Sequence, residues 1–222
     1  MREAPIPAGL PASTGGSWAS PTRASPTRAW PTPVLPSPES CDYAAYWCEE
    51  NIARFLGRDD LKVEASWALL VSNASKTVAM LGQRAGAAPR GFVVWDYHVV
   101  ALLILGANQA PLVFDFDSIH GSPLPAEDWI SASFPSAAEP GLRPLFRLIP
   151  GRDYVEGLSS DRSHMLRPDG SWAAPPPPWP TFGLGRRNNL GEIIDMSIEL
   201  PGAILDLEGL VDFCSGRGRG ME

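Results

Sequence analysis

The spacing of apolar residues predicts one short helix early in the chain. Ile52, Phe55 and Leu56 follow the i, i+3, i+4 pattern of a single helix face, which predicts a helix over residues 48–56. Cys48 lies one turn before Ile52 on the same face. This cysteine therefore stands at the N-terminus of the predicted helix.

Three later runs have the composition of β-strands. Residues 67–72 are apolar, residues 91–105 contain β-branched and aromatic stretches, and residues 111–117 alternate between apolar and other side chains. A short Gly- and Asn-containing link at 106–109 separates the last two runs, so we expect an antiparallel hairpin. An apolar stretch over residues 205–213 predicts a closing helix.

Segments rich in Pro, Gly and Ser interrupt these elements. We interpret residues 119–141 and 166–188 as loops, the second containing an extended polyproline run at 175–178. Residues 1–40 are dominated by Pro, Ser, Thr, Ala and Gly, and they bury too little apolar surface to offset the entropy of ordering. We therefore expect a disordered tail over 1–40 and one domain over 41–222. A transit peptide is the alternative for the tail, because Glu3 is its only acidic residue before Glu39.

Composition limits the classes of function. The chain has 222 residues with a formal net charge of −7, which argues against a nucleic-acid partner. The longest apolar run, residues 99–105, is too short to cross a bilayer, so no membrane partner is expected. Three cysteines favour a reducing compartment over a disulfide framework. We expect a cytoplasmic monomer, with the nucleus as a further location.

One histidine and two aspartates meet on the expected hairpin. A two-residue turn at Gly106 and Ala107 would place His98 opposite Asp115, whereas a four-residue turn centred one place later would place it opposite Asp117. Side chains directly across an antiparallel pair are close enough to interact, and a carboxylate can then orient an imidazole. A structural hydrogen bond would have the same spacing.

Cys48 is the candidate nucleophile. At a helix N-terminus the dipole and free N–H groups favour a thiolate and can bind an oxyanion. Glu49 and Glu50 oppose a low thiol pKa, so an adjacent imidazolium would be needed. A chain order of Cys, then His, then Asp is found in papain-like and transglutaminase-like enzymes. A buried inert cysteine is the alternative reading.

Four motifs resemble the protein N-terminal glutamine amidohydrolase family. They are CEEN at 48–51, WDYHVV at 95–100, FDFD at 114–117 and SDRSHM at 160–165, and the resemblance extends from about residue 41 to about 213. It implies a catalytic triad of Cys48, His98 and Asp115, which selects between the two aspartates. It also implies deamidation of N-terminal glutamine through a thioester intermediate.

The same resemblance implies the fold, the partners and the cofactor requirement. The expected class is α+β, an α-β-α sandwich around a mostly antiparallel sheet of the papain/transglutaminase-like kind. The partners are proteins or peptides bearing an N-terminal Gln, within the N-degron pathway. No metal and no organic cofactor is implied.

Recognition of a free N-terminus requires a group that binds the α-ammonium. The acidic candidates within the motifs are Glu49, Asp96 and Asp161, with Glu50 as a further acid. Each also has a structural reading: the glutamates could cap the helix, and Asp161 could pair with Arg162.

Other functional classes stay open at this stage. A papain-like protease or a transglutaminase-like enzyme could use the same three residues on peptide bonds or on internal Gln, although no calcium loop of EF-hand type is present. An interaction module could present its Pro-rich segments to aromatic grooves. Retention of all three triad positions argues against an inactive scaffold.

Overall fold

A six-stranded antiparallel sheet forms the centre of the computed structural model, which describes residues 35–106, 109–134, 138–200 and 202–216. Residues 1–34, on which most of the expected tail falls, lie outside the described residues. The strand order is β6-β5-β4-β1-β7-β8. The strands are β1 (Ala65–Ser72), β4 (His98–Ile104), β5 (Leu112–Phe114), β6 (Leu124–Pro125), β7 (Leu145–Pro150) and β8 (Ala203–Leu205). A separate antiparallel pair contains β2 (Val78–Met80) and β3 (Val93–Trp95).

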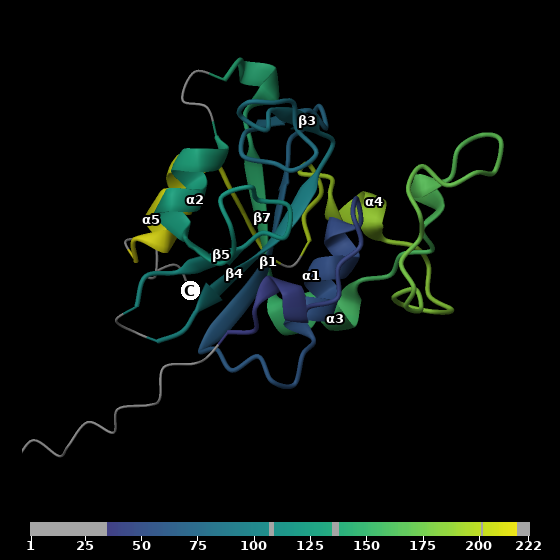
Figure 1. Cartoon of the computed structure of the whole chain (residues 1–222), viewed down its shortest axis with the longest axis horizontal. Helices are drawn as coiled ribbons and strands as arrows, with labels where there is room; N and C mark the ends of the chain where they lie inside the picture. The colour runs from purple at the N-terminus through teal and green to yellow at the C-terminus, as the bar shows by residue number, and fades with distance from the viewer. Residues whose placement is uncertain (1–34, 107–108, 135–137, 201, 217–222) are drawn as a thin grey trace, which may run out of the picture. The chain divides into compact units, whose positions relative to one another are not determined.

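Helices cover both faces of the six-stranded sheet (Figure 1). One face carries α1 (Cys48–Leu56), α3 (Gly151–Gly157) and α4 (Leu190–Ile193), and the other carries α2 (Ala126–Ser133) and α5 (Leu207–Cys214). Three short 3-10 helices complete the described elements: η1 (Pro38–Ser40), η2 (Pro140–Leu142) and η3 (Ser163–Met165). Because both faces are covered, every residue of β4 is buried, and the strand is a continuous apolar run after His98.

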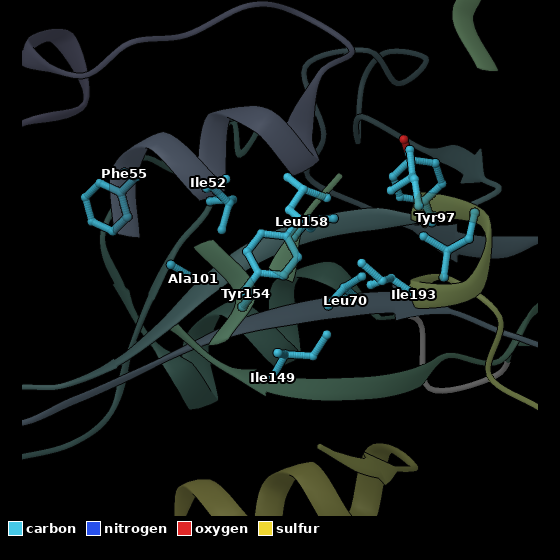
Figure 2. Close-up of a cluster of buried hydrophobic side chains, with 14 of the residues drawn as sticks. Ile52, Phe55, Leu70, Tyr97, Ala101, Ile149, Tyr154, Leu158 and Ile193 are labelled. Atoms are coloured by element: carbon cyan, nitrogen blue, oxygen red, sulfur yellow. The ribbon is translucent and has the colours of Figure 1, made fainter. Parts of the chain in front are cut away.

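Two hydrophobic clusters hold the layers together. Beneath α1 and α3, Ile52 and Tyr154 pack with strand residues such as Leu70 and Ala101 (Figure 2). The opposite cluster joins α2 and α5 to the other side of the same strands. Leu35 packs against the first cluster, so the core of the described chain reaches back to that residue. The chain is therefore α+β with a mostly antiparallel sheet, as expected.

The apolar spacing located most of the elements around the site. The helix over 48–56 is confirmed as α1, the strand over 67–72 as part of β1, and the closing helix as α5. The loop over 166–188 contains neither helix nor strand. The interpretation of residues 119–141 as a loop was wrong, because β6, α2 and η2 lie there. Trp129 and Ile130 give α2 its buried face, despite the flanking Pro and Ser residues.

The hairpin between β4 and β5 is confirmed, with the second of the two predicted registers. Ala101 pairs with Phe114 and Leu103 pairs with Leu112, which is the register of the longer turn. Residues 91–105, expected as one region, divide between β3 and β4, which belong to different sheets. Within the described ranges, no helix combines the length and apolarity needed to cross a bilayer.

Candidate active site

Cys48 is the first residue of α1, and the chain before it is held in a constrained conformation. Tyr46 has a φ of 69°, in the left-handed region that non-glycine residues occupy at an energetic cost. Asn51 fixes this turn, since its side chain accepts the Ala44 N–H at 2.8 Å and donates to the Ala44 carbonyl at 2.8 Å. The buried Trp47 donates its indole N–H to the Pro175 carbonyl at 2.9 Å. The position of the thiol is thus set from both sides of the helix start.

A buried ion pair ties α1 to the loop that follows α3. The Arg162 guanidinium donates to both oxygens of Glu50 at 2.8 and 2.7 Å, and the Trp179 indole N–H donates to Glu50 at 2.7 Å. Glu50 is fully buried, and a buried carboxylate needs a partner of opposite charge. The planar Arg162 guanidinium supplies it, because its two N–H groups match the two carboxylate oxygens. The alternative that Arg162 pairs with Asp161 is therefore wrong, as is the alternative that Glu50 caps the helix.

His98 begins β4 and is bound to Asp115, which directly follows β5. The distance from His98 Nε2 to Asp115 Oδ1 is 2.9 Å, and both side chains are almost completely buried. The observed register would place Asp117 opposite His98. The contact is made to Asp115 instead, because β5 ends at Phe114 and the chain turns there. Trp95 stacks on the imidazole with ring centroids 5.8 Å apart and planes 12° from parallel.

The Asp115 carboxylate is surrounded by donors on both oxygens. Oδ1 accepts from His98 and from the Asp117 N–H at 3.0 Å, and Oδ2 accepts from Gln83 and from Trp129, each at 3.0 Å. Burial alone would raise its pKa, but the His98 charge and these hydrogen bonds outweigh burial and lower the Asp115 pKa to about 2. Asp115 is therefore ionised and fixed in orientation at neutral pH.

The charges around His98 make its imidazole a stronger base than usual. Burial opposes a charge on the imidazole, yet the Asp115 carboxylate, with smaller contributions from Asp117 and Glu49, raises the His98 pKa above its usual value. The hydrogen bond to Asp115 occupies Nε2, which leaves Nδ1 as the nitrogen for proton exchange on the other side of the ring.

Cys48 is held as a thiol in this arrangement. Burial, followed by the charges of Glu49, Asp117 and Asp96, raises the Cys48 pKa well above its usual value, while the Val99 N–H acts in the opposite direction. Val99 directly follows His98, so the backbone at the start of β4 acts on the thiol at the start of α1. Loss of the thiol proton therefore needs a base and a change in the surrounding charge.

Both Cys48 and His98 line one cleft of about 650 Å³. Acidic side chains dominate its charged lining, and among the described residues that form it none is Lys or Arg. The acids are Asp96, Asp117, Asp161 and Glu192. Aromatic rings of Tyr46, Trp95 and Tyr97 form part of the remaining wall. Such a cleft suits a substrate that carries a positive charge beside an apolar stem.

The three predicted substrate-binding acids differ in their environments. Asp96 lines the cleft and accepts the Tyr97 N–H at 2.9 Å. Asp161 also lines it, and one of its oxygens accepts from the Ser163 N–H at 2.9 Å and from Asn188 at 2.5 Å. Glu49 is fully buried behind the cleft wall. The sequence patterns thus located the acidic region without ranking its members.

Three side chains of types that bind metals lie close together, but the carboxylate of one of them is already fully hydrogen-bonded. The ligand atoms of His98, Asp115 and Asp117 lie within 4.8 Å of one another. Asp115 already accepts four hydrogen bonds through its two oxygens. A metal ion would have to displace these donors, so the donor set fits the orientation of an imidazole better than coordination.

Several residues of the site could not be identified from spacing. Gln83 follows β2, and Trp129 belongs to α2, yet both donate to Asp115. Asp117 was considered only as a partner for His98, whereas it lines the cleft and accepts from the Tyr43 hydroxyl at 2.6 Å. The available signal in the sequence was the presence of Trp and Tyr, because the N–H or O–H group of a buried Trp or Tyr needs a hydrogen-bond partner. His164 also lines the cleft.

The fold and the cleft together indicate a class of enzyme. An α+β domain that presents a cysteine at a helix start, beside a histidine held by a buried aspartate, has the parts of a nucleophilic hydrolase site. A family model described as N-terminal glutamine amidase matches residues 43–214.

Individual relatives agree with the family model. Three animal proteins that are named protein N-terminal glutamine amidohydrolase are similar to this chain. The protein of Caenorhabditis briggsae is 34% identical over 167 residues, 73% of this chain and 89% of that protein. That of Drosophila ananassae is 36% identical over 180 residues, covering 77% and 87%. That of Bos taurus is 33% identical over 181 residues, covering 78% and 86%. The chain belongs to the N-terminal glutamine amidase family, and it is an amidohydrolase, an enzyme that cleaves carbon–nitrogen bonds.

Proposed function

We propose that this enzyme converts the N-terminal glutamine of proteins and peptides to glutamate and releases ammonia. The observation that carries the proposal is the opening of Cys48 and His98 onto one acid-lined cleft, with His98 bound at 2.9 Å to a buried Asp115. The names of the relatives support the same reaction.

In the proposed mechanism, Cys48, His98 and Asp115 act as a triad. The thiol proton of Cys48 passes to Nδ1 of His98, and the thiolate attacks the side-chain carboxamide carbon of the glutamine. Backbone N–H groups at the start of α1, including that of Cys48, stabilise the oxyanion because the first N–H groups of a helix have no partner within the helix.

The second half of the reaction releases the product. The imidazolium of His98 protonates the departing ammonia and leaves a thioester on Cys48. His98 then takes a proton from water, the resulting hydroxide attacks the thioester carbon, and the carbon–sulfur bond breaks to release glutamate. The imidazolium of His98 returns its proton to the Cys48 thiolate, which reforms the thiol. Asp115 accepts the hydrogen bond from Nε2 of His98. This bond holds the imidazole in one tautomer, and the Asp115 charge stabilises the imidazolium.

The acidic lining supports recognition of a free α-ammonium. Asp96 and Asp161 line the cleft, and Glu49 adjoins the nucleophile, so each is a candidate for binding the substrate N-terminus. An acetylated glutamine has no cation, and the carboxylates would lose charge pairing on binding it. Recognition of this kind separates an N-terminal from an internal Gln.

We further propose a papain/transglutaminase-like arrangement of the domain. A nucleophile at a helix start, packed against adjacent strands that supply His and Asp, supports that relation. We also propose that the enzyme acts as a cytoplasmic and nuclear monomer, without cofactor, in the N-degron pathway. There its product, an N-terminal glutamate, is the group that the pathway modifies next.

The competing readings are less well supported. Three of the four prolines at 175–178 are exposed, but two carbonyls of the segment are already bound within the domain: Pro175 accepts from Trp47, and Pro177 accepts from Arg162 at 3.2 Å. This weakens the interpretation as a ligand for aromatic grooves. A papain-like or transglutaminase-like enzyme acting on internal Gln or peptide bonds is disfavoured by the family membership.

Four peptides that differ only at their start test the proposal. The starts are Gln, Asn, acetyl-Gln and Gly-Gln, and only the Gln peptide should release ammonia efficiently. Asn is one methylene shorter, so with its amine seated its carbonyl carbon would stop short of Cys48, and misplacement by about 1 Å can cost roughly 10²-fold. Comparable turnover of the acetylated or Gly-extended peptide would contradict the assignment.

The nucleophile is tested in the same assay. Cys48→Ala should abolish ammonia release while the protein remains folded. Cys41→Ala is the matched control, because the Cys41 thiol donates to the Ser37 carbonyl and lies outside the lining of the cleft. Activity retained by Cys48→Ala would exclude the proposed chemistry.

A further inference from the structure

Glu49 combines complete burial with an incompletely satisfied carboxylate. Its Oε2 accepts from the Tyr97 hydroxyl at 3.1 Å and from the Cys48 thiol at 3.8 Å. Its Oε1 has no hydrogen-bond partner among the described residues. His164 Nε2 lies 3.4 Å from that oxygen and forms an ion pair with it when the imidazole is protonated, but the two atoms do not meet hydrogen-bond geometry. A buried carboxylate oxygen without a donor is unfavourable, so Oε1 marks a place where a cation belongs.

This oxygen lies next to side chains that line the cleft. His164 and Tyr97, the two residues beside Glu49, both line the cleft. His164 lies on η3, in the loop before the polyproline run, and its side chain is 26% exposed. Displacement of this imidazole would let a small cation approach Oε1 within a few ångströms of the Cys48 thiol.

The other acids of the cleft lack this combination. Asp161 accepts from a backbone N–H and from Asn188, and Asp96 accepts from the Tyr97 N–H. Asp117 accepts from the Tyr43 hydroxyl, and Glu192 pairs with Arg187. Among these carboxylates, the one that contacts the nucleophile directly is Glu49.

We propose that Glu49 binds the α-ammonium of the substrate through Oε1, and that this charge neutralisation permits Cys48 to lose its proton. The inference rests on the proposed function and deepens it, because the substrate's own N-terminus then activates the nucleophile that attacks its side chain. In the free enzyme the thiol stays protonated and is protected from side reactions.

The electrostatics of the free enzyme agree with this sequence of events. After burial, Glu49 is the largest contribution that raises the Cys48 pKa. An ammonium at Oε1 offsets the Glu49 charge, so the thiol proton can move to His98. In that step the S–H bond breaks and an N–H bond forms at Nδ1, since Nε2 remains bound to Asp115. An internal or acetylated Gln has no ammonium and fails to trigger the transfer.

If binding of the amine activates Cys48, the preference for free over acetylated Gln peptides should appear in kcat as well as in KM. If Glu49 only held the amine in both ground and transition states, loss of the amine would raise KM alone. Because binding of the amine also produces the thiolate, an acetylated Gln peptide should show a lower kcat as well as a higher KM. The two effects are separable in steady-state kinetics.

The test uses Glu49→Gln, which removes the charge and preserves an acceptor for the Tyr97 hydroxyl. Alkylation of Cys48 by iodoacetamide is followed by mass spectrometry from pH 6 to 10 on the folded full-length chain. The midpoint of alkylation should move to lower pH, and the rate at pH 7.5 should rise several-fold, because a negative charge beside the thiol is gone. In contrast, kcat/KM for the Gln peptide should fall by roughly 10² or more.

Opposite changes in the two measurements separate this role from the alternatives. A parallel fall of alkylation and hydrolysis would show that Glu49 is a base or a support for the fold, and would overturn the inference. Hydrolysis within about threefold of wild type would also overturn it. Glu64→Gln, an exposed site, is the matched control and should change neither quantity.

A second variant covers the case in which Glu49→Gln does not fold. Glu49→Asp keeps the charge and withdraws it by one methylene, so the preference for Gln over acetyl-Gln peptides should shrink while alkylation stays near wild type. An unchanged preference would overturn the inference. Absence of ammonia release by the wild-type enzyme from any Gln peptide would instead refute the proposed function, which the alkylation measurement does not depend on.

Discussion

At the scale of single residues, the site depends on how many donors surround one carboxylate. Asp115 accepts from His98, Gln83, Trp129 and the Asp117 backbone, and these contacts fix the oxygen that faces the imidazole. Asp117 lies two residues away, lines the cleft, and contacts a tyrosine hydroxyl. The two aspartates therefore have different roles despite similar sequence surroundings.

Replacement of each aspartate separates these roles. Asp115→Asn should lower kcat strongly, because the amide cannot stabilise the imidazolium; the equivalent change costs roughly 10⁴ in a serine protease. Asp117→Asn should cost much less, and His98→Ala should be nearly inactive. Rates of ammonia release from a Gln peptide provide the comparison. A larger loss with Asp117→Asn than with Asp115→Asn would contradict the assigned triad.

The Asp115 carboxylate also makes stability depend on acid. Its pKa falls from an ordinary 3.8 to about 2 in the folded chain, so the folded state binds fewer protons than the unfolded state between these values. The contribution to the free energy of unfolding, about 2 kcal/mol, is present above about pH 4 and disappears as the pH falls towards 2. Urea unfolding at pH 3 and pH 6 should show a smaller acid loss for Asp115→Asn than for wild type. Equal losses would count against this pKa.

At the scale of elements, α1 is positioned by a buried charge network as well as by its apolar face. Glu50 on α1 receives two hydrogen bonds from Arg162 and one from Trp179, which joins the nucleophile helix to the loop over 158–188. Ile52 and Phe55 pack the same helix onto the sheet. The apolar contacts fix the helix on the sheet, and the ion pair fixes the loop that walls the cleft.

Breaking this ion pair on one side should destabilise the whole domain. Arg162→Met leaves a buried Glu50 charge without its partner, which typically costs about 3–5 kcal/mol. The double variant Glu50→Gln/Arg162→Met should recover part of this loss, since no uncompensated charge remains. Urea unfolding of the two single variants and the double variant measures the coupling.

An exposed ion pair supplies the matched control for that cycle. Arg152 and Glu156 pair across one turn of α3 with both side chains largely in solvent. Arg152→Met should leave the unfolding midpoint almost unchanged, because exposed pairs contribute little. A comparable loss of stability in Arg152→Met and Arg162→Met would show that the cost of losing an ion pair does not depend on its burial.

At the scale of the whole molecule, the described core begins at Leu35, and the family model matches residues 43–214. The residues that line the cleft or contact its lining lie between Tyr43 and Ile194. The first 34 residues, dominated by Pro, Ser, Thr, Ala and Gly, precede the region that the family model matches.

Deletion of residues 1–34 should therefore preserve the enzyme. We expect kcat/KM for a Gln peptide within about twofold of the full chain, and an unchanged urea midpoint. Extending the deletion through Asp42 is the contrasting case, because it removes the Leu35 packing and the Asp42–Arg54 ion pair. A large activity loss in the shorter, soluble truncation would show that the first 34 residues shape the site.

Local patterns in the sequence were enough to predict the elements that carry the proposed triad. The helix over 48–56 and the β4–β5 hairpin follow from the apolar pattern, because burial of one helix face leaves a periodic pattern and burial of a strand on both faces leaves a continuous apolar run. The motifs around Cys48, His98 and Asp115 indicated the family, which the family model and the relatives then showed.

Only the tertiary structure decided which groups surround the reacting atoms. Gln83, Trp129 and Arg162 reach the site from elements that are distant in the sequence, and local periodicity carries no information about such contacts. The same holds for the Glu49 carboxylate, whose unpartnered oxygen depends on where Tyr97 and His164 lie. Burial of an element leaves a pattern of apolar residues that can be read within that element. Charge pairing and desolvation depend on all the groups packed around a site, which come from distant parts of the sequence.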